Sequence, residues 1–223
     1  MQTPGAVIWD VDGTLVDTAE LHYQAWGVLA REIGKRYTRK DFAATFGWRN
    51  PEIIPLLFGQ EYSPEQVDQL GRRKEDYYRA EAAKGLNLLP GVRELVSALD
   101  AAGFRQAVGS SAPRANIEMI LAMTGLADVL SAVVSMEDTT RGKPDPQVFL
   151  TAAERVGTAP SRCVVFEDAP VGIRAAKAGG MKAVGVTFVG HHPEDALRAE
   201  GADLIVPSLR EVTVESVRAL LKG

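Results

Sequence analysis

Near its start the chain has a short apolar run that ends in two carboxylates, Asp10 and Asp12. Residues 6–9 show no alternation of polar and apolar side chains, which favours a strand buried on both faces of a sheet. Asp10 would be the last residue of this strand, and Gly13 suits the turn beyond it. Ligands bind at the carboxyl ends of strands in open α/β sheets. The pattern therefore predicts a parallel sheet with chemistry at the end of its first strand.

Beyond residue 86 the sequence alternates between strand and helix patterns. Most of the helical segments are followed by glycine, which commonly ends helices. The later strands are expected at residues 104–108, 132–134, 163–166, 183–186 and 204–206. Such alternation predicts right-handed β-α-β crossovers and an α/β fold with a doubly wound, Rossmann-like parallel sheet covered by helices on both faces.

Between the first strand and residue 86 the pattern is helical throughout. Thr18 and Ser63 suit the N-caps of the first and last helices of this block. Four helices are expected, at residues 18–33, 38–46, 52–58 and 63–84. The sequence therefore predicts a core domain formed by residues 1–16 and 86–223, with an all-helical cap domain inserted at residues 17–85.

Composition limits the function. The 223 residues carry a formal net charge of −4, with 46% hydrophobic and 24% charged residues, as in globular proteins. An acidic chain lacks the basic face that nucleic acid or an anionic membrane requires, so neither is an expected partner. No apolar run approaches a membrane span and no leader pattern stands at the N-terminus, which indicates a cytoplasmic protein. The single cysteine, Cys163, lies in an apolar run and is expected to be a buried core residue.

Polar side chains follow several of the predicted strands. Ser110 follows the second strand, Lys143 lies in the loop after the third, and Glu167 and Asp168 follow the fourth. A parallel sheet places these strand ends, with the two aspartates of the first strand, at one edge. That many carboxylates repel one another unless a cation lies among them, and hard oxygen ligands favour Mg²⁺. A lysine and a hydroxyl beside them suit a phosphoryl group, so the set predicts phosphoryl transfer.

The same motifs, in the same order, characterise the haloacid dehalogenase (HAD) superfamily: Asp10-x-Asp12-Gly13-Thr14, Ser110, Lys143 and Glu167-Asp168. The chain resembles this superfamily over its whole length, and the helical insertion resembles its C1 cap. The resemblance implies a Mg²⁺-dependent enzyme in which Asp10 is the nucleophile and Asp12 the general acid and base. Members that cleave carbon–halogen or carbon–phosphorus bonds lack the second aspartate. Asp12 therefore favours chemistry at a phosphate oxygen.

The resemblance also implies roles for the other strand-end residues. Ser110 and Lys143 would hold the phosphoryl oxygens, and Ser111 would contribute its backbone N–H at a helix N-terminus. The implied ligands of Mg²⁺ are the carboxylates of Asp10, Glu167 and Asp168 and the backbone carbonyl of Asp12.

The cap sequence is similar to that of the β-phosphoglucomutases within this superfamily. His22, Arg49 and Lys74 match mutase positions: the histidine takes part in coupling cap closure to the acid/base, and the other two contact the distal part of the substrate. The loop at residues 47–51 reads Gly-Trp-Arg-Asn-Pro, whereas the mutases carry serines around the arginine and one more residue. Because of this difference, a sugar-phosphate phosphatase is favoured over a mutase. Water would then replace the second sugar hydroxyl as the acceptor.

Three classes of function thus remain open. The first is a phosphatase, expected to be a monomer, that acts on a small phosphorylated metabolite. The second is a β-phosphoglucomutase-type phosphomutase with a bisphosphate intermediate. The third, a phospho-accepting switch like a response-regulator receiver, is disfavoured, because its aspartate should follow the third strand and it has no use for a helical cap.

Overall fold

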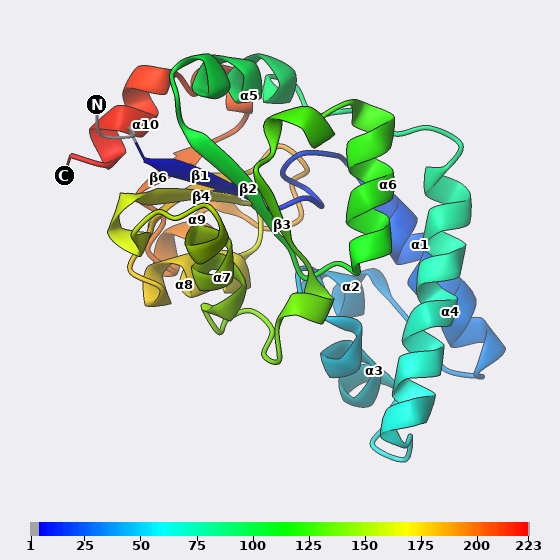
Figure 1. Ribbon diagram of the computed structural model, residues 1–223. Coiled ribbons are helices and arrows are strands. Elements are labelled where there is room, and N and C mark those ends of the chain that lie inside the picture. Colours follow the sequence, from blue (N-terminus) through cyan, green and yellow to red (C-terminus); the bar gives the residue numbers. More distant parts are fainter. Residues whose placement is uncertain (1–4, 223) are drawn as a thin grey trace.

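The apolar runs of the sequence form one parallel sheet of six strands in the computed structural model, which describes residues 5–222 (Figure 1). The strands are β1 (Ala6–Trp9), β2 (Arg105–Gly109), β3 (Ala132–Val134), β4 (Cys163–Glu167), β5 (Lys182–Val186) and β6 (Leu204–Val206). Their spatial order is β3-β2-β1-β4-β5-β6, so the direction of winding switches between β1 and β4. Ligands of doubly wound folds bind at this switch point. The predicted fold class is confirmed.

Successive residues of β1 point to opposite faces of the sheet. Val7 and Trp9 belong to one apolar cluster, and Ala6 and Ile8 to the other. The first cluster is completed by α5 (Val92–Ala101), α6 (Arg114–Thr124) and α10 (Val214–Leu220). The second is completed by α7 (Gln147–Arg155), α8 (Pro170–Ala178) and α9 (Glu194–Ala199) (Figure 1). The strand is buried on both faces, as predicted, and Cys163 is also fully buried.

The remaining helices stand at one end of the sheet (Figure 1). They are α1 (Ala19–Glu32), α2 (Arg39–Thr45), α3 (Asn50–Phe58) and α4 (Pro64–Ala82). We call these four helices, with Thr18 before them and the segments between them, the cap, and the rest of the molecule the core. Trp26, Ile54 and Phe58 contribute to an apolar cluster within the cap. The division into two domains at residues 16/17 and 85/86 stays a prediction.

Two segments connect the cap to the core, and they lie side by side. Val16 and Leu88 form an isolated antiparallel bridge, and the N–H of Leu89 donates to the carbonyl of Leu15 over 2.9 Å. Both connections therefore leave the core at one place.

The structure corrects the sequence analysis at one helix start. Ser63 caps α4 as predicted, since its hydroxyl accepts the N–H of Gln66. Thr18 makes no side-chain cap bond to α1, because its hydroxyl donates instead to the carboxylate of Asp12. Four short 3₁₀ turns were not predicted: Ala127–Val129, Met136–Asp138, Pro160–Arg162 and Leu209–Glu211. Within residues 5–222, none of the helices combines the length and the apolar character that crossing a bilayer requires.

Candidate active site

Three carboxylates meet where the winding of the sheet switches direction. Asp10 directly follows β1, Glu167 ends β4, and Asp168 follows it. Oxygen atoms of all three lie within 4.8 Å of one another, and the three residues are buried. Gly13 permits this approach, because a Cβ atom at this position would lie 2.1 Å from Oδ2 of Asp168. Its φ of +83° is also one that glycine adopts without strain.

Lys143 joins two of these carboxylates. The loop after β3 brings its ammonium within 2.7 Å of Oδ1 of Asp10 and 2.6 Å of Oε1 of Glu167. Burial lowers the pKa of Lys143, but the charges of the two carboxylates outweigh this effect and raise the pKa above its usual value. The resemblance predicts that this lysine holds phosphoryl oxygens, and its ammonium lies directly beside Asp10.

The cluster carries more negative charge than its single ammonium balances. Burial raises the pKa of Asp10 and of Asp168, and repulsion from Glu167 adds to both shifts. Both oxygens of Glu167 have protein partners, namely Lys143 and the N–H of Ala169. In contrast, Oδ2 of Asp168 is buried without a hydrogen-bond partner. Three carboxylates and one ammonium leave two negative charges, so the residues fit a divalent cation with oxygen ligands such as Mg²⁺.

Asp12 has a different environment although it lies two residues from Asp10. Its Oδ1 accepts hydrogen bonds from the Thr18 hydroxyl over 2.5 Å and from Nε2 of His22 over 3.1 Å. Burial raises the pKa of Asp12, but the attraction of His22 and these hydrogen bonds outweigh it, so the pKa lies below 3.8. Its carboxylate is not part of the acidic cluster that can hold a metal.

Helix α1 presents its contacts to the site at a spacing of four residues. Thr18 and His22 bind Asp12, and Trp26 lines the pocket above it. Residues four apart lie on one face of a helix. The spacing of four residues between Thr18 and His22 could have indicated from the sequence that Thr18 faces the site. The sequence pattern instead favoured Thr18 as the N-cap of the helix.

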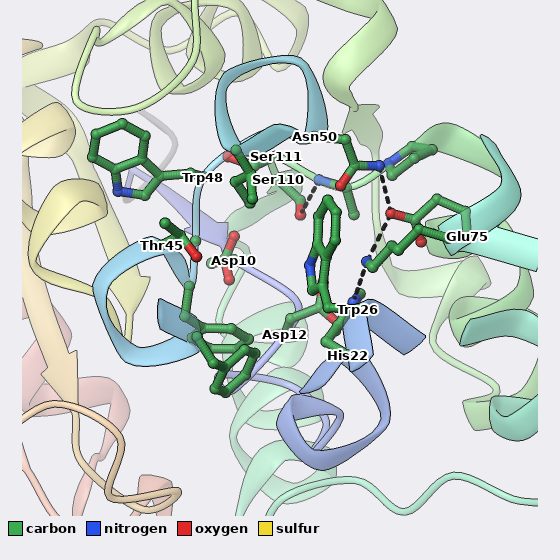
Figure 2. A pocket seen from close by; sticks show the side chains of 17 residues that line it. Asp10, Asp12, His22, Trp26, Thr45, Trp48, Asn50, Glu75, Ser110 and Ser111 are labelled. Carbon is green, nitrogen blue, oxygen red and sulfur yellow. Dashed lines mark hydrogen bonds and ion pairs between the residues drawn. The ribbon is translucent and has the colours of Figure 1, made fainter. Parts of the chain in front are cut away.

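A pocket lies between the cap and the acidic cluster. Figure 2 shows Asp10 near its centre, with Thr45 and Trp48 on one side and Asn50 and Glu75 on the other. The pocket's cavity volume is about 50 Å³. Much of the cap wall is aromatic, from Trp26, Phe42, Phe46 and Trp48.

The core contributes two hydroxyl residues to this pocket. Ser110 and Ser111 both line it, directly after β2. The hydroxyl of Ser110 is buried and accepts the N–H of Ala112 over 3.1 Å. Both serines therefore lie where the sequence analysis expected phosphoryl-binding groups.

The three cap residues predicted to bind substrate differ in position. His22 and Lys74 line the pocket, but Arg49 does not. The guanidinium of Arg49 donates to the backbone carbonyls of Thr139, at 3.0 Å, and Thr140, at 3.4 Å.

Lys74 is 2% exposed, although its charged run is typical of a solvated helix face. Its ammonium contacts Nδ1 of His22 at 2.7 Å and Glu75 at 2.9 Å. The sequence analysis did not single out Glu75.

Comparison with known proteins agrees with this geometry. A family model for haloacid dehalogenase-like hydrolases matches residues 4–180. The chain belongs to this family. Among other HAD-like proteins, it is 34% identical to β-phosphoglucomutase of Bacillus subtilis over 217 residues, which cover 94% of this chain and 92% of that protein. It is 36% identical to fructose-1-phosphate phosphatase YqaB of Escherichia coli over 188 residues, 82% of this chain and 96% of the relative.

Solved HAD-like structures extend the agreement to the whole fold. The structure of β-phosphoglucomutase from Clostridium difficile superposes with a TM-score of 0.89 at 25% identity, covering 98% of this chain and 97% of that one. The resemblance stated from the sequence motifs is confirmed, and the protein is an enzyme of the HAD family. Its relatives include both phosphatases and phosphomutases of phosphorylated sugars.

Proposed function

We propose that the protein is a Mg²⁺-dependent phosphatase that acts on a small sugar phosphate through an aspartyl-phosphate at Asp10. Asp10 lines the base of the pocket, and Lys143 holds one of its oxygens. Asp12 lies beside it with its carboxylate oriented by two hydrogen bonds from the cap. One group is thus placed to attack phosphorus and another to move a proton.

The reaction has two halves. A carboxylate oxygen of Asp10 forms a bond to phosphorus while the bond from phosphorus to the sugar oxygen breaks. Asp12, whose low pKa keeps it ionised in the free protein, first takes up a proton from solvent and then gives it to that oxygen. Water then attacks phosphorus and loses a proton to Asp12, and the bond from phosphorus to Asp10 breaks to release phosphate. Ser110 and Lys143 hold the phosphoryl oxygens through both halves.

Asp10, Glu167 and Asp168, with the backbone carbonyl of Asp12, would hold the metal. When bound, Mg²⁺ supplies positive charge that stabilises the phosphoryl oxygens in the transition state. The unpartnered oxygen of Asp168 supports this assignment.

One observation favours a phosphatase over a mutase: the far end of the pocket has no unpaired cation. Among the residues that the structure describes there, Lys74 is the one lysine or arginine, and it forms an ion pair with Glu75. Arg49 is bound to the loop at Thr139 and Thr140. A mutase must hold a second phosphate away from the nucleophile, and proteins do so mainly with arginine and lysine.

A β-phosphoglucomutase-type phosphomutase is the second candidate. The 34% identity to the B. subtilis mutase and the superposition on the C. difficile mutase favour it. The two candidates share the first half-reaction and differ in the acceptor of the phosphoryl group.

An assay with two products separates them. β-Glucose 1-phosphate is supplied with a glucose bisphosphate primer, and free phosphate and glucose 6-phosphate are measured together. A phosphatase releases phosphate faster than it forms glucose 6-phosphate, and the opposite ratio selects the mutase. A panel of other sugar phosphates, fructose 1-phosphate included, identifies the preferred substrate. The Asp10→Asn variant is the control and should form neither product.

A further inference from the structure

Glu75 is a buried carboxylate of the cap that the proposed reaction does not use. It is 3% exposed, and Lys74 and Asn50 donate to its Oε1 over 2.9 and 2.7 Å. Its Oε2 accepts from Nδ2 of Asn116 over 2.6 Å. Asn116 lies on α6 of the core and is 1% exposed. Glu75 is therefore bonded to the cap through one oxygen and to the core through the other.

A chain of contacts leads from Glu75 to the proposed acid/base. The ammonium of Lys74 has only donors, so Nδ1 of His22, 2.7 Å away, must accept from it. The ring proton of a neutral His22 then lies on Nε2, which donates to Oδ1 of Asp12. The ring of Tyr78 stacks on His22 with centroids 4.0 Å apart and fixes its plane. Figure 2 shows dashed lines that lead from Glu75 to Asn50 and toward His22.

The buried ammonium depends on Glu75. Among residues 5–222, Glu75 is the one carboxylate in an ion pair with Lys74. Burial raises the pKa of Glu75, but the charge of Lys74 and the hydrogen bonds from Lys74 and Asn50 outweigh it and hold the pKa below its usual value. Glu75 is thus the charged partner that keeps Lys74 in place, since an unpaired buried cation is strongly disfavoured.

We propose that Glu75 is a positioning residue that couples docking of the cap on α6 to the orientation of Asp12. Asn116 binds Glu75 when the cap lies against the core, and Glu75 in turn holds Lys74 against His22. This proposal rests on the proposed function only in what it predicts for turnover. The predicted effect of Glu75 on the tautomer of His22 is independent of the substrate.

The first test is ¹⁵N NMR of the histidine rings in the Glu75→Gln variant. The chain has only three histidines, so a His22→Gln variant assigns the signals of His22. The wild-type protein should show His22 with the proton on Nε2, and Glu75→Gln should show a mixture of tautomers. Glu81→Gln is the matched control, because Glu81 lies on the same helix and, among residues 5–222, forms its ion pair with Lys84 at the surface. A wild-type spectrum for Glu75→Gln overturns the proposal.

The second test separates positioning from folding through kinetics on the preferred sugar phosphate. Glu75→Gln and Asn116→Ala should each lower kcat, by roughly tenfold for Glu75→Gln, with little change in KM. Oδ1 of Asn116 also accepts from the guanidinium of Arg79 over 2.8 Å, and an Arg79→Gln variant measures that second contact. If Glu75 and Asn116 act through one contact, the double variant loses no more than Glu75→Gln alone beyond the loss seen in Arg79→Gln. Losses that multiply, or a kcat unchanged in both single variants, overturn the coupling. If the wild-type protein turns over no sugar phosphate, the proposed function fails while the NMR test still decides the role of Glu75.

Discussion

At the scale of single residues, the site gives different environments to two aspartates that lie two positions apart in the sequence. Asp10 faces Lys143 and two further carboxylates, and its pKa is raised by burial and by repulsion from Glu167. Asp12 faces the cap, where His22 and Thr18 favour its ionised form. Without a metal, these pKa shifts oppose the proposed roles, since a nucleophile must be ionised and a general acid must be protonated. A cation in the acidic cluster would favour the ionised form of Asp10, and Asp12 must take up a proton before it can act as the acid.

The Asp12→Asn variant tests this separation. With sugar phosphates, whose leaving oxygen needs a proton, kcat should fall about 10²- to 10⁴-fold. With p-nitrophenyl phosphate, whose leaving group needs none, the variant should release about one equivalent of p-nitrophenol in a burst and then slow, because the attacking water lacks its base. Stopped-flow absorbance measures the burst. Asp17→Asn, at an exposed position nearby, is the control and should behave as wild type. Equal losses on both substrates without a burst would contradict the assignment.

Asp168→Asn tests the balance of charge in the acidic cluster. The folded state raises the pKa of Asp168 well above its ordinary value of 3.8. Ionisation of this carboxyl group therefore destabilises the metal-free protein increasingly as the pH rises from 3.8 toward the pKa of the folded state. In EDTA at pH 7 the variant should therefore be more stable than wild type, by about 1.4 kcal/mol for each pKa unit of the shift. Added Mg²⁺ should stabilise the wild type more than the variant. Thermal unfolding with and without Mg²⁺ checks both statements, and a less stable variant in EDTA would refute the charge argument.

At the scale of elements, the loop after β3 determines where Lys143 lies. Asp138 anchors the start of this loop: its carboxylate accepts the N–H of Ser135 over 2.8 Å and pairs with Arg114 on α6 and Arg155 on α7. Arg49 of the cap binds the next residues of the loop. Residues of α6 and α7 in the core and Arg49 in the cap thus hold the loop after β3, which has little regular structure of its own.

Asp138→Asn should weaken this anchor in a pH-dependent way. Burial raises the pKa of Asp138, but hydrogen bonds from Arg155 and Ser135 and the charge of Arg114 outweigh it, so the pKa lies well below 3.8. The stabilisation is complete above pH 3.8 and disappears as the pH falls toward the lower folded-state value. Urea unfolding at pH 7 should show a loss of about 2 kcal/mol in the variant, and the difference should shrink in a series toward low pH. A difference that is constant with pH would rule out the ionised carboxylate as its cause.

At the scale of the whole molecule, the cap must move for the proposed substrate to enter. The cavity of about 50 Å³ has room for only a few water molecules, since one water needs roughly 10–15 Å³ by the same measure, so it is too small for a sugar phosphate. The two connections between cap and core lie together at Val16 and Leu88. Gly85 precedes the second connection with a φ of +148°. A hinge at this place would let the cap swing without disturbing the sheet.

A disulfide between cap and core tests the movement. A Cβ atom at Gly47 would lie 3.0 Å from Cβ of Ala169, somewhat closer than the roughly 3.5–4.5 Å found in disulfides, so the two segments must separate slightly to form the bond. The oxidised Gly47→Cys/Ala169→Cys protein should lose most of its turnover of sugar phosphates, and dithiothreitol should restore it. The reduced double variant is its own control for the substitutions. Cys163 is fully buried and should not compete for the new thiols. Equal turnover in both redox states would exclude a moving cap.

The order of strands and helices and the chemistry at the strand ends follow from local sequence patterns. The central strands β1 and β4 are buried on both faces and therefore appear as apolar runs, and a parallel sheet brings the carboxyl ends of its strands to one edge. The sequence therefore predicts that Asp10, Lys143 and Asp168 lie together.

The contacts between the cap and the core, in contrast, depend on the three-dimensional packing. The burial of Lys74, the bond between Glu75 and Asn116, and the binding of Arg49 to the loop at Thr139 all join residues distant in sequence. Local patterns report which face of a helix is apolar, and they placed Lys74 in a run typical of solvent. Which polar groups meet across an interface depends on the relative position of two packed units, and no local periodicity encodes that position.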